Sequence, residues 1–266
     1  MKKYGITKSN NIVEMIDFHI ENIRINGYSI AECLVDEETC DYFANKIEEI
    51  YLTQENAFGR ANLIEINELD VARMPLIYDT TFSKFFMHPL VLELTTKIIG
   101  DNFHLHLQNG IINRPGTEHH QTSWHRDLPY QDWTISKPLA FNAFFCLSDF
   151  YPENGATFVL PFSHNIDFLP SDKYIEENEK QLIAKKGSVV FFNSMIYHRA
   201  GNNISNETRY GLNNMFVVPI IKQQIILSNC INENDFSDEE IKVIGSRFDV
   251  PSNVNQFRQK KLSKKI

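Results

Sequence analysis

The sequence predicts a mainly β domain, a sandwich or jelly roll, with helices packed in front of it. Two observations lead to this prediction. Residues 1–100 carry apolar positions at helical spacing, whereas residues after Gly100 form short apolar runs separated by Gly, Asn and Pro. Short strands between such turn residues are typical of sandwiches and jelly rolls. The length of 266 residues suits one large domain.

Two helices are expected in the N-terminal part. The first is capped by Asp36, and its apolar positions recur at helical spacing: Cys40, Phe43, Ile47, Ile50 and Tyr51. The second begins with Pro89 in its first turn and ends at Gly100. A shorter helix near the C-terminus is predicted by Ser237 and Glu240, which have the spacing of a capping box.

Five segments after Gly100 have the pattern of strands. They are residues 103–112, 139–147, 155–160, 187–192 and 210–221. The single domain, residues 1–266, therefore divides into a helical region at about 12–100, a β core at about 101–222 and a C-terminal helix with a basic tail at 223–266.

The polar segment 166–186 separates two of the predicted strands and is longer than an ordinary connection. It also offers few residues that could anchor it. We expect it to be a mobile cover over the mouth of the site, and the alternative is a solvated loop without a catalytic part.

Composition excludes several classes of function. The net charge of −8 argues against nucleic-acid binding, and the basic residues at the C-terminus are expected to form a solvated tail. No apolar run reaches the roughly 18 residues of a membrane span. The first ten residues lack the apolar core of a signal peptide, and the four cysteines have no metal or redox spacing. A cytoplasmic protein with reduced thiols is expected.

The most informative residues are His125 and Asp127. Residues two apart on a strand point to the same side, so this pair can present an imidazole and a carboxylate to one metal ion. His198, which follows a predicted strand, can supply the third ligand. Two histidines and one carboxylate leave coordination positions free for O2 and a chelating co-substrate, which suits Fe(II). Zinc prefers a closed tetrahedral site, or three protein ligands plus water.

Arg209 adds weight to this pattern, because an isolated His-x-Asp pair is common by chance. It lies eleven residues after His198, beyond the turn-like residues 201–203. A returning strand is expected to bring Arg209 back beside His198. Its guanidinium group can then pair with the far carboxylate of a dicarboxylate that chelates the metal.

These residues match a known family: the chain resembles the phytanoyl-CoA dioxygenase family of Fe(II)/2-oxoglutarate enzymes. The resemblance covers roughly residues 20–220. Its motifs are residues 124–130, Asn154-Gly155, residues 160–164, Gly187-Ser188, His198 and Arg209. It implies a double-stranded β-helix, a cupin-like jelly roll, buttressed by N-terminal helices. It also implies Fe(II) on His125, Asp127 and His198, with 2-oxoglutarate and O2 as co-substrates.

The resemblance extends to further residues. It places Arg209 on the far carboxylate of 2-oxoglutarate and Gln108 and Phe144 near the same co-substrate, although Phe144 can equally be core. Ala200 stands where relatives often carry Ser, and Phe162 replaces the Gly of a Pro-Gly-Ser-His motif.

Other polar and aromatic residues around the predicted ligands invite a role. Arg126, Tyr130 and Trp133 can face the substrate, with packing as the alternative for the two aromatic residues. His119 and His120 are adjacent, so both cannot easily bind the same iron.

The predicted function is hydroxylation of an unactivated C–H bond of a small molecule, with release of succinate and CO2. The presence of Asp127 favours hydroxylation, because halogenating relatives replace this carboxylate. The alternatives are a non-catalytic metal-binding jelly roll, with a ligand-binding or sensor role, and a zinc or manganese hydrolase. The substrate and the oligomeric state do not follow from the sequence.

Overall fold

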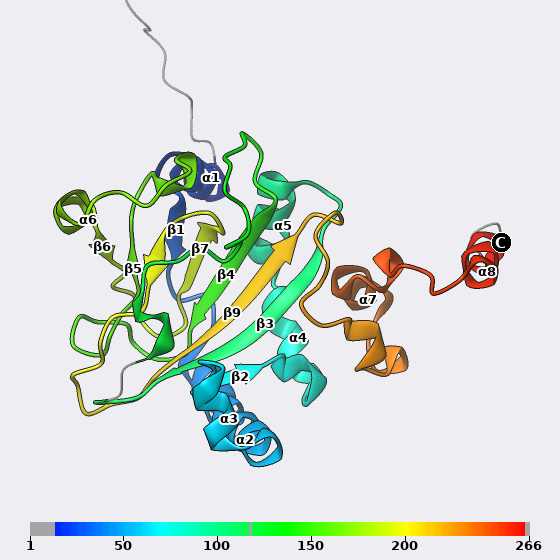
Figure 1. Ribbon diagram of the computed structural model, residues 1–266, viewed down its shortest axis with the longest axis horizontal. Coiled ribbons are helices and arrows are strands. Elements are labelled where there is room, and N and C mark those ends of the chain that lie inside the picture. Colours follow the sequence, from blue (N-terminus) through cyan, green and yellow to red (C-terminus); the bar gives the residue numbers. More distant parts are fainter. Residues whose placement is uncertain (1–13, 117–118, 264–266) are drawn as a thin grey trace, which may run out of the picture.

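The fold is built on two antiparallel sheets, seen in a computed structural model that describes residues 14–116 and 119–263 (Figure 1). The six-stranded sheet has the order β1 (Tyr28–Ala31), β7 (Val189–Asn193), β4 (Ala140–Cys146), β9 (Arg209–Val217), β3 (His104–Asn113) and β2 (Val71–Arg73). The three-stranded sheet has the order β6 (Lys180–Gln181), β5 (Phe158–Val159) and β8 (His198–Arg199). The predicted mainly β architecture is therefore confirmed.

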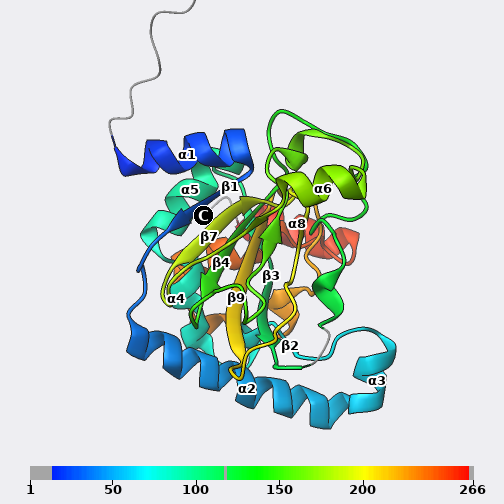
Figure 2. The same ribbon diagram turned by 90° about the vertical axis from the view of Figure 1, so that its left-hand side faces the viewer.

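Helices cover one side of the large sheet, and the small sheet lies on its other side (Figure 2). The covering helices are α1 (Met15–Asn26), α2 (Glu37–Phe58), α3 (Arg60–Glu65), α4 (Ser83–Phe86) and α5 (Pro89–Ile99). Helix α6 (Asp172–Asn178) lies near the small sheet, α7 (Asp238–Ile244) packs against β3, and α8 (Val254–Ser263) extends away from the body (Figure 1).

The three predicted helices are confirmed, with the caps that the sequence indicates. Asp36 accepts a hydrogen bond of 2.8 Å from the backbone nitrogen of Thr39 at the start of α2. Helix α5 has Pro89 in its first turn and is followed by Gly100. Ser237 and Glu240 form the capping box of α7. In contrast, the short strands β1 and β2 interrupt a region that the sequence predicts to be mainly helical.

Alternate side chains of strand β4 pack into two apolar layers, one on each face of the large sheet. Phe141 and Phe145 face the helices, whereas Phe144 and Cys146 belong to the smaller apolar cluster between the sheets. This alternation follows from the period of two along a strand. Asn142 shares the inner face with Phe144 and is fully buried, so the inner side of β4 carries one polar group into an apolar layer.

The segment 166–186 is better anchored than the sequence suggests. Ile175 and Leu182 are buried, and Glu179 forms an ion pair of 3.0 Å with Arg199. Its later part contains β6, which pairs with β5. Buried side chains and a strand ladder hold this segment, so the premise that it lacks anchors is wrong. Its mobility stays a prediction.

None of the helices in the described part of the chain combines the length and the apolar character that crossing a membrane requires.

Candidate metal centre

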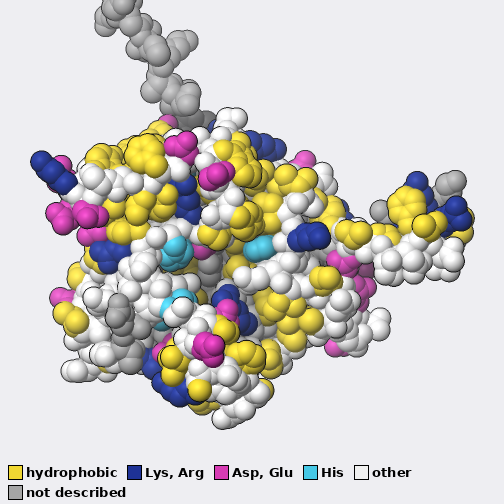
Figure 3. All heavy atoms as spheres, viewed as in Figure 1, with side chains coloured by type: hydrophobic (Ala, Val, Ile, Leu, Met, Phe, Trp, Pro, Cys, Tyr) yellow, Lys and Arg dark blue, Asp and Glu magenta, His cyan; other side chains and the backbone are white. Residues whose placement is uncertain are grey.

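A cavity of about 670 Å³ lies between the two sheets and contains the predicted metal ligands. Figure 3 shows histidine side chains around a hollow on this face of the molecule. Both sheets contribute to the lining: Phe144, Phe192, Arg209 and Asn213 come from the large sheet, and Val159 and His198 from the small one.

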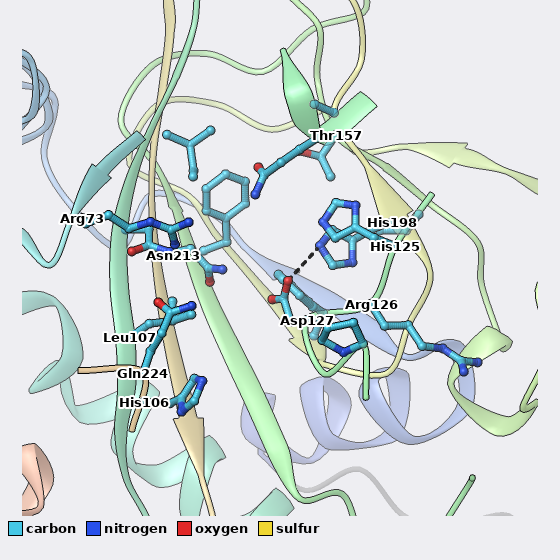
Figure 4. Close-up of a pocket in the computed structure, with 18 of the residues that line it drawn as sticks. Arg73, His106, Leu107, His125, Arg126, Asp127, Thr157, His198, Asn213 and Gln224 are labelled. Carbon is cyan, nitrogen blue, oxygen red and sulfur yellow. Dashed lines mark ion pairs between the residues drawn. The ribbon is translucent and has the colours of Figure 1, made fainter. Parts of the chain in front are cut away.

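His125, Asp127 and His198 converge on one point of this cavity (Figure 4). One ligand atom from each residue lies within 4.8 Å of the other two. Nε2 of His198 is 3.4 Å from Oδ1 of Asp127, and the two imidazole centroids are 4.3 Å apart. No other group of three His, Cys, Asp or Glu residues in the described ranges comes together in this way.

Backbone hydrogen bonds position the three residues. His125 and His198 exchange two backbone bonds of 3.0 Å, and the nitrogen of Asp127 donates to Ser194 at 3.1 Å. The expectation that His125 and Asp127 lie on a regular strand is wrong. His125 forms an isolated bridge, and Asp127 sits in a bend, where its backbone is held by Ser194 instead of a strand partner.

Each ligand is oriented by a second contact. Nδ1 of His125 lies 2.9 Å from the carbonyl of Ser123, and Nδ1 of His198 lies 3.1 Å from that of Ile196. A carbonyl only accepts, so each Nδ1 carries the proton and each Nε2 offers its lone pair to a metal. Nδ2 of Asn142 donates to Oδ2 of Asp127 at 2.7 Å, which leaves Oδ1 for the metal.

The pKa values of Asp127 and His125 are lowered, whereas that of His198 is raised because the Asp127 carboxylate more than offsets its burial. Burial raises the pKa of Asp127, but the neighbouring histidines and Asn142 more than offset this and bring the pKa to about 2. Burial lowers the pKa of His125 to about 4. A deprotonated carboxylate beside a neutral imidazole is the form in which these groups bind a cation.

Arg209 is a buried cation without an anionic partner. Its side chain is 1% exposed, and Nε and Nη1 have no hydrogen-bond partner. Its guanidinium lies 4.4 Å from the centroid of the Phe150 ring, and burial lowers its pKa to about 10. Among the residues that the structure describes, no carboxylate pairs with it. A buried charge of this kind requires a counter-ion, and a ligand carboxylate reaching this part of the cavity supplies one.

Arg209 lies on a different sheet from the one expected. The sequence suggests a returning strand beside His198, but β9 belongs to the large sheet and β8 to the small one. Both residues line the same cavity from opposite sheets. The distance between the sheets leaves room for a ligand between the metal ligands and the guanidinium.

Four more residues were expected to contact the co-substrate or the substrate, and two of them line the cavity. Phe144 and Tyr130 line it, and Tyr130 is 61% exposed. Trp133 is outside the lining and half exposed. Gln108 is also outside it: its side chain accepts from the nitrogen of Leu76 and donates to Asn214 on the helix side of the sheet.

A β-bulge explains the position of Gln108. The pairing of β3 with β9 shifts between Leu105 and Leu107, so His106 is an extra residue. Beyond the bulge, alternation puts Gln108 on the helix side and Asn109 on the cavity side.

Arg126 touches the cavity, but its guanidinium points away from it (Figure 4). Nη2 donates to the carbonyls of Ser163, at 3.0 Å, and of Ile166. The guanidinium also stacks over Tyr197. Arg126 therefore braces the loop that follows β5, and the expectation that it faces the substrate is wrong for its charged group.

Sequence reasoning missed several polar residues of the site. Asn142 donates a hydrogen bond to Asp127 and stands inside a run of apolar and aromatic residues. A single amide in such a run is the feature of the sequence that could have indicated a site residue. Arg73, Asn109 and Asn213 also line the cavity. Their positions depend on strand pairing, which one sequence does not reveal.

The comparisons with known proteins agree with this geometry. The model of the phytanoyl-CoA dioxygenase (PhyH) family matches residues 23–211, which is more than half of the chain. The chain belongs to this family. The resemblance predicted from the sequence motifs is thereby confirmed, and the membership implies Fe(II) and 2-oxoglutarate.

Curated relatives of this PhyH-family protein include three informative ones. It is 31% identical over 210 residues to the uncharacterized protein Rv1501 of Mycobacterium tuberculosis, covering 75% of this chain and 74% of that one. It is 24% identical to ectoine dioxygenase of Nocardia farcinica, covering 73% and 74%. It is 22% identical to the peroxisomal phytanoyl-CoA dioxygenase of Bos taurus, covering 78% and 69%.

A solved structure shares the fold of this PhyH-family chain. It is the non-heme alpha ketoglutarate dependent epimerase SnoN from nogalamycin biosynthesis, with a TM-score of 0.54 and 18% identity. The match covers 77% of this chain and 83% of that one. At this identity the likeness concerns the fold alone.

Proposed function

We propose that this protein is an Fe(II)- and 2-oxoglutarate-dependent dioxygenase that hydroxylates an unactivated C–H bond of a small molecule and releases succinate and CO2. The observation that carries the proposal is the pairing of two features in one cavity. Three side chains able to bind a metal converge on one side, and the buried Arg209, which forms no ion pair within the described residues, lies on the other. A dicarboxylate that chelates the metal at one end needs such a cation at the other.

The fold fits this proposal as a double-stranded β-helix. The two antiparallel sheets face each other and hold the cavity between them. Each sheet contributes to the site, because His198 lies on β8 and Arg209 on β9. Opposed sheets of this kind are the two halves expected of a jelly roll.

The residues of the chain have distinct tasks in this mechanism. Nε2 of His125 and His198 and Oδ1 of Asp127 would hold Fe(II), which would supply the O2-activating chemistry together with 2-oxoglutarate. Arg209 would bind the far carboxylate of 2-oxoglutarate and so orient this co-substrate. Phe144, Val159 and Phe192 line the cavity and keep bulk water from the reacting groups.

The phenyl ring of Phe144 is fixed near the co-substrate by close packing. A Cβ atom on Gly211 of the neighbouring strand would lie 2.6 Å from Cζ of Phe144, so only glycine leaves room for the ring. Phe150 packs edge-on against Phe144 and at the same time lies under Arg209. The two phenyl rings therefore pack together beside the Arg209 guanidinium, and Phe144 presents its ring to the cavity.

The chemistry of the ligands argues against a zinc or manganese hydrolase, because two histidines and one carboxylate leave several positions open. A non-catalytic binding module has no evident use for both a metal triad and a buried arginine. The cytoplasm suits the four free cysteines.

The test uses the full chain with Fe(II), 2-oxoglutarate and O2. We expect slow formation of succinate and CO2 in equal amounts without substrate, and stimulation by the true substrate from a metabolite screen. Asp127→Ala should abolish both metal binding and succinate formation. Mass spectrometry distinguishes hydroxylation, which adds one oxygen atom, from epimerisation, which leaves the mass unchanged. Absence of succinate in the iron-loaded protein refutes the proposal.

A further inference from the structure

The cavity has a second polar wall that the proposed chemistry does not use. His106, Lys222 and Gln224 line it, and we name these three residues the polar wall. Figure 4 shows His106 and Gln224 on the side of the cavity opposite His125, Asp127 and His198. A molecule in the cavity therefore lies between the metal ligands and the polar wall.

His106 is a buried side chain whose ring interacts with the backbone of Lys222 but is not fully hydrogen-bonded. It is 8% exposed, and its Nδ1 atom is buried without a hydrogen-bond partner. The bulge in β3 places it on the cavity wall together with Leu107. Bulges commonly re-aim a side chain next to an active site. Burying an unsatisfied ring nitrogen costs free energy, which a ligand in the cavity can recover.

Lys222 and Gln224 are held in place by the residue between them. Nε2 of Gln223 donates to the carbonyls of Leu105, at 2.7 Å, and Ile244, at 2.6 Å. The nitrogen of Gln224 also reaches the carbonyl of His106 at 3.4 Å. Lys222, Gln223 and Gln224 all line the cavity, and the side chains of Lys222 and Gln224 are exposed at its mouth.

Lys222 is the cation of the cavity that remains available. Within the described part of the chain, four cations line the cavity: Arg73, Arg126, Arg209 and Lys222. Arg73 is paired with Glu68 through two hydrogen bonds of 2.5 and 3.2 Å. Arg126 binds the carbonyls of Ser163 and Ile166. Arg209 is assigned to 2-oxoglutarate.

Lys222 forms no ion pair with any acid in the described part of the chain. Among residues 14–116 and 119–263, the only acidic side chain that lines the cavity is Asp127, which is assigned to the metal in the proposed function. The cavity therefore offers positive charge that neither the metal nor 2-oxoglutarate accounts for, in a protein with a net charge of −8. An anion is the ligand that such a field favours.

We propose that the polar wall binds the anionic head group of the substrate, a carboxylate or a phosphate monoester. The inference rests on the proposed function and narrows its substrate to a small organic acid. Lys222 supplies the charge, and the His106 ring and the Gln224 amide supply hydrogen bonds. The apolar side chains of Ile220 and Leu182 also line the cavity and can contact the carbon chain between the head group and the metal.

The test measures binding of straight-chain probes from four to ten carbons by calorimetry. The protein is the full chain loaded with Fe(II) and saturating 2-oxoglutarate in the absence of oxygen. Each chain length is tested as the carboxylate, the phosphate monoester and the neutral amide. The variants are Lys222→Gln, His106→Phe and the control Lys185→Gln, whose side chain is 78% exposed and does not line the cavity.

We expect at least one acid to bind about tenfold more tightly than its amide, which corresponds to about 1.4 kcal/mol. Lys222→Gln should remove this preference and His106→Phe should weaken acid binding, while Lys185→Gln behaves as the unaltered protein. Affinity for Fe(II) and 2-oxoglutarate should stay unchanged in all three variants. The comparison of carboxylate with phosphate then identifies the head group.

Several outcomes overturn the inference. They are equal binding of acids and amides, an unchanged preference in Lys222→Gln, and no binding by any acid at millimolar concentration. Acid binding that is seen without 2-oxoglutarate but lost when 2-oxoglutarate is saturating also overturns it, because the acid would then occupy the Arg209 site. Failure of the proposed function is seen separately, as absence of succinate from the iron-loaded protein in air.

Discussion

The Nδ2 atom of Asn142 donates a hydrogen bond of 2.7 Å to Oδ2 of Asp127 and another of 2.9 Å to Oδ1 of Asn213. The hydroxyl of Ser194 in turn donates to Oδ1 of Asn142. The amide is therefore fixed by its own partners, and it holds one oxygen of Asp127 away from the metal position. The carboxylate is set to bind through its other oxygen only.

Asn142→Ala should weaken Fe(II) binding, because Asp127 loses the contact that orients it. Loss of such an outer contact typically costs 10–100-fold in metal affinity. Anaerobic calorimetry with Fe(II) measures the change, and Asn178→Ala on the exposed helix α6 serves as the control. Affinity equal to that of the control variant would mean that Asp127 is oriented by its backbone alone.

Arg209→Ala should weaken binding of 2-oxoglutarate by at least about a hundredfold, since breaking a buried charge pair costs on the order of 3–5 kcal/mol. Arg209→Lys should restore only part of the affinity, because an ammonium group does not match a carboxylate with two parallel bonds. Titration of 2-oxoglutarate into the Fe(II)-loaded variants gives both values. Unchanged affinity in Arg209→Ala would assign the far carboxylate to another residue.

Gly211→Ala should push the ring of Phe144 from its place, because the new methyl group would lie 2.6 Å from Cζ of that ring. Overpacking of this kind costs about 1–3 kcal/mol in stability. The double variant Gly211→Ala, Phe144→Leu should recover part of the loss. Denaturant unfolding of the two single variants and the double variant measures the coupling, and strictly additive losses would show that the two residues do not interact.

Arg126→Ala should lower the melting temperature without changing the affinity for 2-oxoglutarate. The substitution leaves the carbonyls of Ser163 and Ile166 without their donor, at a cost of about 1–3 kcal/mol. A loss of this size corresponds to several degrees for a chain of this length. Scanning calorimetry tests the first effect and titration the second. A stable variant with weakened 2-oxoglutarate binding would assign Arg126 to the co-substrate instead.

Local patterns in the sequence are sufficient to predict the three helices and the three residues that converge at the candidate metal site. Asp36, Pro89 and Ser237 mark helix starts through contacts within one turn, which a sequence shows directly. His125 and Asp127 are near neighbours in the chain, so their convergence needs little from the rest of the fold.

The remaining site depends on pairing between distant strands. Gln108 was expected at the co-substrate, but one extra residue in β3 reverses the faces beyond it. Strand β9, which carries Arg209, pairs with β3 and β4, whereas β8 belongs to the other sheet. Asn142 became visible as a site residue only when its strand was placed beside Asp127. Bulges and strand order are properties of the assembled sheets and leave little trace in a single sequence.

The anchoring of Gln223 has a practical consequence for redesign of this protein. Its two side-chain bonds to Leu105 and Ile244 tie the segment after β9 to the body of the protein, whereas the side chains of Ile220, Lys222 and Gln224 are exposed. Positions 220, 222 and 224 can therefore be randomised together in a library while position 223 is kept. Such a library would sample new substrate preferences without changing the residues proposed to hold iron and 2-oxoglutarate, which lie on other segments of the chain.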